Sequence, residues 1–78
     1  MISVIYVDDE PDLLELVRLF LERSGEFQVA TSASARDALA NPALRSYDVI
    51  ISDYQMPGMD GIAFLKAVRE QFGDLPFI

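Results

Sequence analysis

Residues 48–61 read Asp-Val-Ile-Ile-Ser-Asp-Tyr-Gln-Met-Pro-Gly-Met-Asp-Gly, and the rest of the chain is organised around them. The first half is apolar and β-branched, which predicts a buried strand over residues 48–52. Pro57, Gly58 and Gly61 then turn the chain sharply and lead into another helix. A carboxylate beside a buried strand is costly unless something pairs with it. Asp53 is therefore expected at the carboxyl end of the strand, facing the kind of crevice in which open α/β sheets hold their sites.

The residues that precede this segment begin with a strand and a helix. Ile2 to Val7 is an almost uninterrupted β-branched and aromatic run, typical of a strand buried on both faces of a parallel sheet. A helix is expected over roughly residues 11–24, with Pro11 in its first turn. Gly25 is expected to end it at the C′ position. The apolar residues expected to face the sheet recur at helical spacing and are Leu13, Leu16, Val17, Phe20 and Leu21.

A second strand is expected from Phe27 to Thr31, and its shorter, more polar sequence places it nearer a sheet edge. Ser32 or Ser34 can cap a short helix that runs through Ala40. Asn41 and Pro42 break that helix before the apolar run described above.

The last third of the chain predicts a helix over Ile62 to Phe72, ended by Gly73, and then the first residues of a fourth strand at Pro76 to Ile78. The alternation of strands and helices predicts an α/β fold with right-handed crossovers and a parallel sheet. Because the sequence stops as an apolar strand begins, we expect residues 1–78 to be an incomplete domain of about three βα units. A natural minimal domain is the alternative.

Composition narrows the function classes. The 78 residues hold 13 acids against 6 bases, for a net charge of −7, so binding to nucleic acid or to an anionic membrane surface is not expected. Cysteine and histidine are absent, which removes disulfides, thiolate metal sites and the commonest general base. No apolar run approaches the ~20 residues of a membrane span, and the first residues do not read as a signal peptide. We expect a cytoplasmic protein.

Three carboxylates follow two strands that are expected to be parallel. Asp8 and Asp9 come directly after the first strand, and Asp53 follows the third. If these strands are neighbours, the three side chains converge, and they repel one another unless a cation joins them. Hard oxygen ligands without Cys or His favour Mg²⁺, Mn²⁺ or Ca²⁺. As the alternative, Asp9 could cap the first helix and Asp53 could order the turn that follows it.

Other acidic and phosphate-binding motifs do not fit. An EF-hand loop starting at Asp8 would need Gly and Glu where Leu13 and Leu19 stand, and no Gly-rich phosphate loop follows the first strand. The remaining chemistry is a carboxylate nucleophile, which attacks phosphorus and forms an aspartyl phosphate. Asp53 is best placed for this role because it heads the long turn. Asp8 and Asp9 would hold the metal, with the backbone carbonyl of Gln55 as a further ligand.

Together these residues resemble the receiver domain of the two-component response-regulator family. The resemblance lies in Val7-Asp8-Asp9-Glu10-Pro11 after the first strand and in the segment from Asp53 to Gly61 after the third. It implies a flavodoxin-like, doubly wound parallel sheet with the strand order 2-1-3-4-5 of that family.

The resemblance also implies roles and partners. Asp53 would be the phosphoacceptor, Asp9 a direct Mg²⁺ ligand, Asp8 a ligand acting mainly through water, and Gln55 a ligand through its carbonyl. The phosphoryl group would come from a phosphohistidine on a sensor histidine kinase or phosphotransfer protein. The family's Ser or Thr after strand four and Lys after strand five lie outside these 78 residues. Lys66 is no substitute, because it falls on a helix face that is expected to be exposed.

Several alternatives remain open at this point. The receiver could belong to a hybrid sensor kinase, or it could be a non-phosphorylated pseudo-receiver that only docks partners. A true enzyme, a Mg²⁺-dependent phosphatase with an aspartyl phosphate intermediate, would typically carry a second Asp two residues after its nucleophile. Gln55 holds that place after Asp53, and Glu10 holds it after Asp8. We therefore expect a phosphoacceptor module rather than an enzyme.

Overall fold

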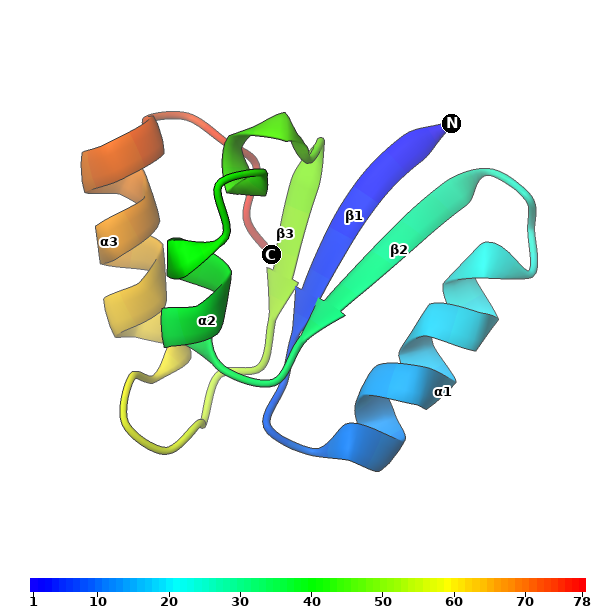
Figure 1. Ribbon diagram of the computed structural model, residues 1–78, viewed down its shortest axis with the longest axis horizontal. Helices are drawn as coiled ribbons and strands as arrows, with labels where there is room; N and C mark the ends of the chain where they lie inside the picture. Colours follow the sequence, from blue (N-terminus) through cyan, green and yellow to red (C-terminus); the bar gives the residue numbers. More distant parts are fainter.

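A computed structural model describes residues 1–78 as a parallel sheet with helices on both faces (Figure 1). The strands lie in the order β2-β1-β3, which confirms the first three positions of the expected topology. In chain order the elements are β1 (Ile2–Val7), α1 (Pro11–Glu22), β2 (Phe27–Ser32), α2 (Ala35–Ala40), the 3₁₀ turn η1 (Leu44–Ser46), β3 (Val49–Ser52) and α3 (Gly61–Phe72).

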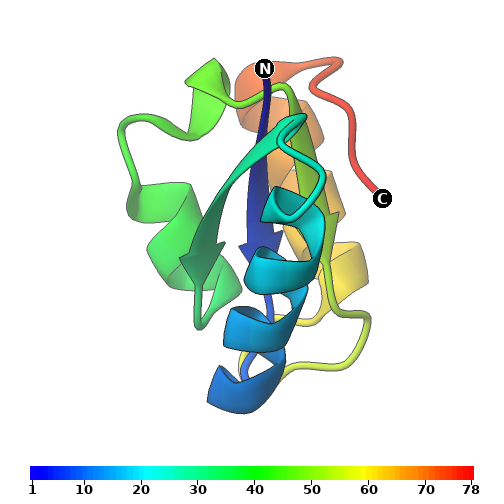
Figure 2. The ribbon, with the colours of Figure 1, turned by 90° about the vertical axis from the view of Figure 1, so that its right-hand side faces the viewer.

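The central strand β1 divides the core into two layers. Successive side chains of a strand point to opposite faces, so Ile5 and Val7 meet the layer of α2 and α3, while Val4 and Tyr6 meet the layer of α1. Figures 1 and 2 show α1 alone on one face of the sheet and the other two helices on the opposite face. Coverage on both sides explains why β1 is buried from Val4 onward.

Helix α1 is rotated about its axis relative to the prediction, so a different set of residues faces the sheet. Val17 and Leu21 pack on the sheet as predicted, together with Leu14, which is not among the residues predicted for that face. The prediction was wrong for the other three leucine and phenylalanine positions: the exposed fractions are 37% for Leu13, 62% for Leu16 and 70% for Phe20. A helix on a narrow sheet buries only one stripe, and the stripe at positions 14, 17 and 21 is the one that faces the apolar side chains of β1 and β2.

The element boundaries shift slightly from the predicted ones. Helix α1 ends at Glu22 with its C-cap at Arg23, so Gly25, with φ of 78°, turns the chain two residues beyond the cap rather than directly at the helix end. Strand β2 does lie at the edge, but it is as long as β1 and not shorter. Ser34 is the cap of α2, because its side chain accepts a hydrogen bond from the N–H of Asp37.

The last residues begin to extend the sheet beyond β3. Phe77 lies opposite Ile50 in a parallel bridge, and the N–H of Ile78 donates to the Ile50 carbonyl at 2.8 Å. The N–H of Ile50 donates in turn to the Pro76 carbonyl, also at 2.8 Å. This confirms that Pro76 to Ile78 lie where a fourth strand starts. None of the three helices has the length and apolar character needed to cross a bilayer.

Candidate metal site

Two backbone hydrogen bonds align the strand ends that carry the acidic residues. The N–H of Asp53 donates to the carbonyl of Val7 at 2.9 Å, and the N–H of Asp8 donates to the carbonyl of Ser32 at 3.1 Å. These bonds continue the parallel register, in which Val7 lies opposite both Ser32 and Ser52. The carboxyl ends of all three strands therefore meet at one edge of the sheet.

Three carboxylates come together at this edge. Asp8, Asp9 and Asp53 each offer an oxygen, and these oxygens lie within 4.8 Å of one another. Asp8 is 2% exposed and is the only charged residue in the buried set, whereas Asp53 is half-buried and Asp9 is exposed. The predicted convergence of these side chains is thus observed, and the cluster opens from a buried floor toward solvent.

Neither alternative role holds for Asp9 or Asp53. The N-cap of α1 is Glu10, and no side chain caps this helix. The turn after Asp53 is held by backbone groups, with the Gly61 N–H donating to the Tyr54 carbonyl at 2.9 Å. No hydrogen bond of the structure ends on the carboxylate of Asp9 or of Asp53, so both are free to bind a ligand.

Asp8 is held firmly by two donors. Its Oδ2 accepts the hydroxyl of Tyr6 at 2.6 Å, and its Oδ1 accepts the backbone N–H of Glu10 at 3.0 Å. Burial, followed by the hydrogen bond to Asp8, raises the pKa of the Tyr6 phenol well above its ordinary value, so the hydroxyl stays protonated and remains a donor. Sequence reasoning did not single out Tyr6. The available signal was its place two residues before Asp8 on the same face of a strand.

Gln55 lies in the loop that follows Asp53, with its side chain exposed. Met56 in the same loop is buried in the core, and Met59 packs against that core. These two methionines therefore anchor the loop to the core on either side of the exposed Pro57 and Gly58. The role of the Gln55 carbonyl as a metal ligand stays a prediction.

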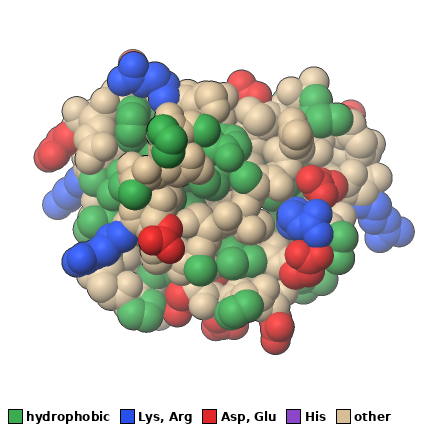
Figure 3. Space-filling view, viewed as in Figure 1, with side chains coloured by type: hydrophobic (Ala, Val, Ile, Leu, Met, Phe, Trp, Pro, Cys, Tyr) green, Lys and Arg blue, Asp and Glu red, His purple; other side chains and the backbone are tan.

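The electrostatics of the cluster fit a divalent cation. The ion pairs of the chain join Arg18 to Glu15 and to Glu22, so no basic side chain neutralises the three carboxylates. Lys66 is exposed on α3, as expected. Acidic side chains line the lower edge of the molecule in Figure 3, the end where the strands of Figure 1 finish. Carboxylate oxygens with no other counter-charge suit a hard divalent cation such as Mg²⁺, Mn²⁺ or Ca²⁺.

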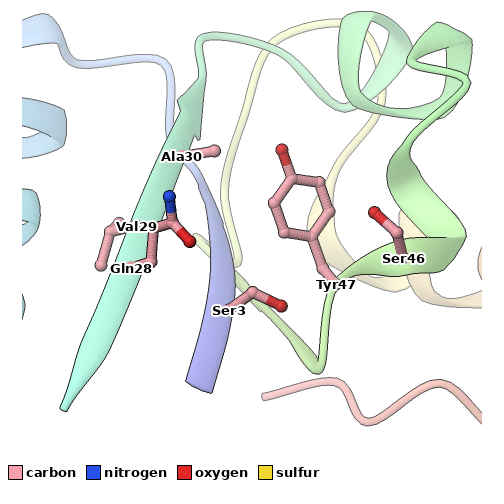
Figure 4. A pocket seen from close by; sticks show the side chains of 6 residues that line it. All are labelled: Ser3, Gln28, Val29, Ala30, Ser46 and Tyr47. Atoms are coloured by element: carbon pink, nitrogen blue, oxygen red, sulfur yellow. The ribbon is translucent and has the colours of Figure 1, made fainter. Parts of the chain in front are cut away.

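A second hollow, of about 370 Å³, lies near the other end of the strands. Figure 4 shows the side chains that line it, which come from β1, β2 and the segment around η1: Ser3, Gln28, Val29, Ala30, Ser46 and Tyr47. It contains no carboxylate and no basic group. The chemistry of the chain is therefore concentrated at the acidic edge.

Comparison with known proteins gives the family. The sequence model of the response regulator receiver domain matches residues 4–78. The chain belongs to this family. It is a receiver domain of two-component signalling, and the resemblance inferred from its motifs is confirmed.

Several response regulators are similar to this chain in sequence and in structure. The response regulator Rre1 of a Synechocystis strain is 42% identical over 79 residues, which cover 99% of this chain and 34% of Rre1. The chemotaxis response regulator CheY4 of Vibrio cholerae is 40% identical with a TM-score of 0.88, over 99% of this chain and 65% of that one. TrrA of Thermotoga maritima, solved in complex with Mg²⁺-BeF, is 28% identical with a TM-score of 0.87, over 99% and 66%. The receiver thus spans about a third of Rre1 and just under two thirds of the two solved chains.

Proposed function

We propose that Asp53 of this receiver accepts a phosphoryl group from a phosphohistidine of a sensor histidine kinase or phosphotransfer protein. In this proposal Mg²⁺, or Mn²⁺ in its place, is held by Asp8, Asp9, Asp53 and the backbone carbonyl of Gln55. The observation that carries the proposal is the meeting of three carboxylate oxygens within 4.8 Å at the carboxyl ends of neighbouring parallel strands.

Asp53 is the member of the cluster best suited to act as the nucleophile. Asp8 is buried, and both of its oxygens already accept hydrogen bonds. Asp53 is half-buried, its carboxylate has no partner, and its backbone is fixed by the bond to Val7. An oxygen of this partly exposed, unpaired carboxylate is therefore free to attack phosphorus.

The proposed reaction transfers a phosphoryl group from a nitrogen of the donor to an oxygen of Asp53. A carboxylate oxygen of Asp53 attacks phosphorus, and the bond between phosphorus and the donor imidazole nitrogen breaks, with its electron pair passing to that nitrogen. The product is a mixed anhydride, aspartyl phosphate. A bound Mg²⁺ supplies neutralising charge for the phosphoryl oxygens. The chain itself supplies a nucleophile with a fixed backbone and an acidic cradle that holds the cation.

The relatives support the choice of metal and partner. TrrA was solved with Mg²⁺-BeF, and the same protein was crystallised in complex with the histidine kinase ThkA. We propose further that residues 1–78 are the N-terminal portion of a receiver domain, because residues 76–78 start a strand and the chain covers 65% of CheY4.

The test uses the full-length protein that carries this receiver. Incubation with acetyl phosphate or a cognate kinase in the presence of Mg²⁺ should add one phosphoryl group, and Asp53→Asn should abolish the labelling. Asp60→Asn is the matched control. It also removes one negative charge from the loop, and its amide can still cap α3, where Asp60 now accepts the Ala63 N–H at 2.9 Å. Undiminished labelling of Asp53→Asn would refute the proposal, and an unlabelled wild type would favour a docking pseudo-receiver.

A further inference from the structure

The phenol of Tyr6 is an unusual feature of the sheet core. Tyr6 is 9% exposed and belongs to the apolar layer between β1, β2 and α1, where it packs with Val4 and Val29. A phenylalanine ring would satisfy that apolar layer equally well. The hydroxyl therefore needs an explanation of its own, and its hydrogen-bond partner is the Oδ2 of Asp8 at 2.6 Å.

The geometry makes this contact specific. Residues two apart in a strand point to the same face, so the Tyr6 ring lies below Asp8 and its hydroxyl reaches the carboxylate at the strand end. On its other oxygen, Asp8 accepts the Glu10 N–H at 3.0 Å. A carboxylate has about four lone-pair sites, so one on each oxygen remains open. The two donors hold the carboxylate plane without exhausting its capacity to bind.

We propose that Tyr6 is a positioning residue for the Mg²⁺ site, which keeps the buried Asp8 carboxylate oriented beside Asp9 and Asp53. This inference rests on the function proposed above. Hydrogen-bond partners behind a ligand fix its orientation, and their loss typically weakens metal binding about 10- to 100-fold. Water cannot easily take over from the hydroxyl, because Asp8 is only 2% exposed.

The competing explanation is that Tyr6 only satisfies a buried charge and stabilises the fold. The two explanations differ in what they predict for metal affinity. If the bond is purely structural, its loss should lower the unfolding midpoint in EDTA and leave the dissociation constant for Mg²⁺ unchanged. If the bond positions Asp8, its loss should also raise that dissociation constant, and the stabilisation that added Mg²⁺ gives should shrink at the same metal concentration.

The test is the variant Tyr6→Phe in the full-length protein, which removes the hydroxyl and keeps the ring. Calorimetric titration with Mg²⁺ alone should give a dissociation constant about tenfold higher than that of the wild type. Tyr47→Phe is the matched control, because it removes a phenolic hydroxyl from the hollow of Figure 4, away from the acids. Its dissociation constant should stay at the wild-type value.

The outcomes separate this inference from the proposed function. If the wild type binds Mg²⁺ and Tyr6→Phe binds it equally well, Tyr6 has no positioning role, while the proposed function stands. Tighter binding by Tyr6→Phe would show that the hydroxyl competes with the metal, which also overturns the inference. If the wild type itself fails to bind Mg²⁺, both the site and the role of Tyr6 are refuted.

Discussion

Gly61→Ala should displace the backbone of the proposed phosphoacceptor. Gly61 is the first residue of α3, and its N–H bonds to the Tyr54 carbonyl. A Cβ added at this position would lie 2.7 Å from the Asp53 carbonyl oxygen and 3.1 Å from the Tyr54 Cα. Both neighbours are backbone atoms, so they cannot rotate away as a long side chain would. The strand end and the helix start must therefore move apart.

The magnitude follows from that contact. Ordinary van der Waals contact begins at 3.4 Å, so the Asp53 carbonyl must retreat by about 0.7 Å. Overpacking of this kind costs about 1–3 kcal/mol, whereas alanine improves helix propensity over glycine by at most about 1 kcal/mol. The clash is therefore the larger effect. We expect a net loss of about 1–2 kcal/mol, and a fall in Tm of about 4–16 °C for a domain of this size.

The rate of phosphorylation should fall by more than the loss of stability alone would cause. Misplacing a reacting group by about 1 Å can cost about 100-fold in rate, so a shift of the Asp53 backbone should slow labelling by acetyl phosphate at least about tenfold. Gly73→Ala is the control. Its φ of 72° also strains a side chain, at a cost of about 1–2 kcal/mol, but a Cβ there meets nothing within 4 Å. Wild-type stability and labelling in Gly61→Ala would refute the reasoning.

Two further predictions concern stability. Phe64 is fully buried, and its ring meets Phe77 edge-to-face at 5.3 Å, so Phe64→Ala should lower the free energy of unfolding by about 3–5 kcal/mol in urea titrations; a loss below about 1 kcal/mol would contradict this packing. The backbone N–H and then the hydroxyl of Ser3 hold the pKa of Asp48 below its ordinary value. The stabilisation from Asp48 is therefore present above the unfolded-state pKa of about 3.9 and lost as pH falls through the lower folded-state pKa. In Asp48→Asn, the midpoint of urea unfolding should therefore fall less steeply at acid pH than in the wild type. An unchanged pH dependence would contradict this role of Asp48.

Much of the fold was predictable because the signals are local. The β-branched runs of β1 and β3, the alternation with helical periodicity and the glycine turns each depend on near neighbours in the sequence. The cap of α2 shows the limit of this reasoning. Ser32 and Ser34 are both chemically suitable, and only the structure shows that Ser34 accepts the Asp37 N–H.

The rotation of α1 was not predictable from its own residues. Its two apolar stripes overlap in the sequence, and the choice between Leu14 and Leu16 as a buried position depends on which side chains of β1 and β2 lie opposite. Those partners come from segments remote in the chain, so helical periodicity alone cannot rank the stripes.

From the sequence alone it follows that Asp8, Asp9 and Asp53 stand at strand ends, and a parallel sheet places such ends at one edge. Only the tertiary structure decides how each carboxylate is held there. Asp8 is buried and bound by Tyr6, whereas Asp53 is left unpaired beside a loop. The reason is physical: strand order follows from patterns that tolerate shifts of several ångströms, but a hydrogen bond forms only where donor and acceptor meet within about 3 Å.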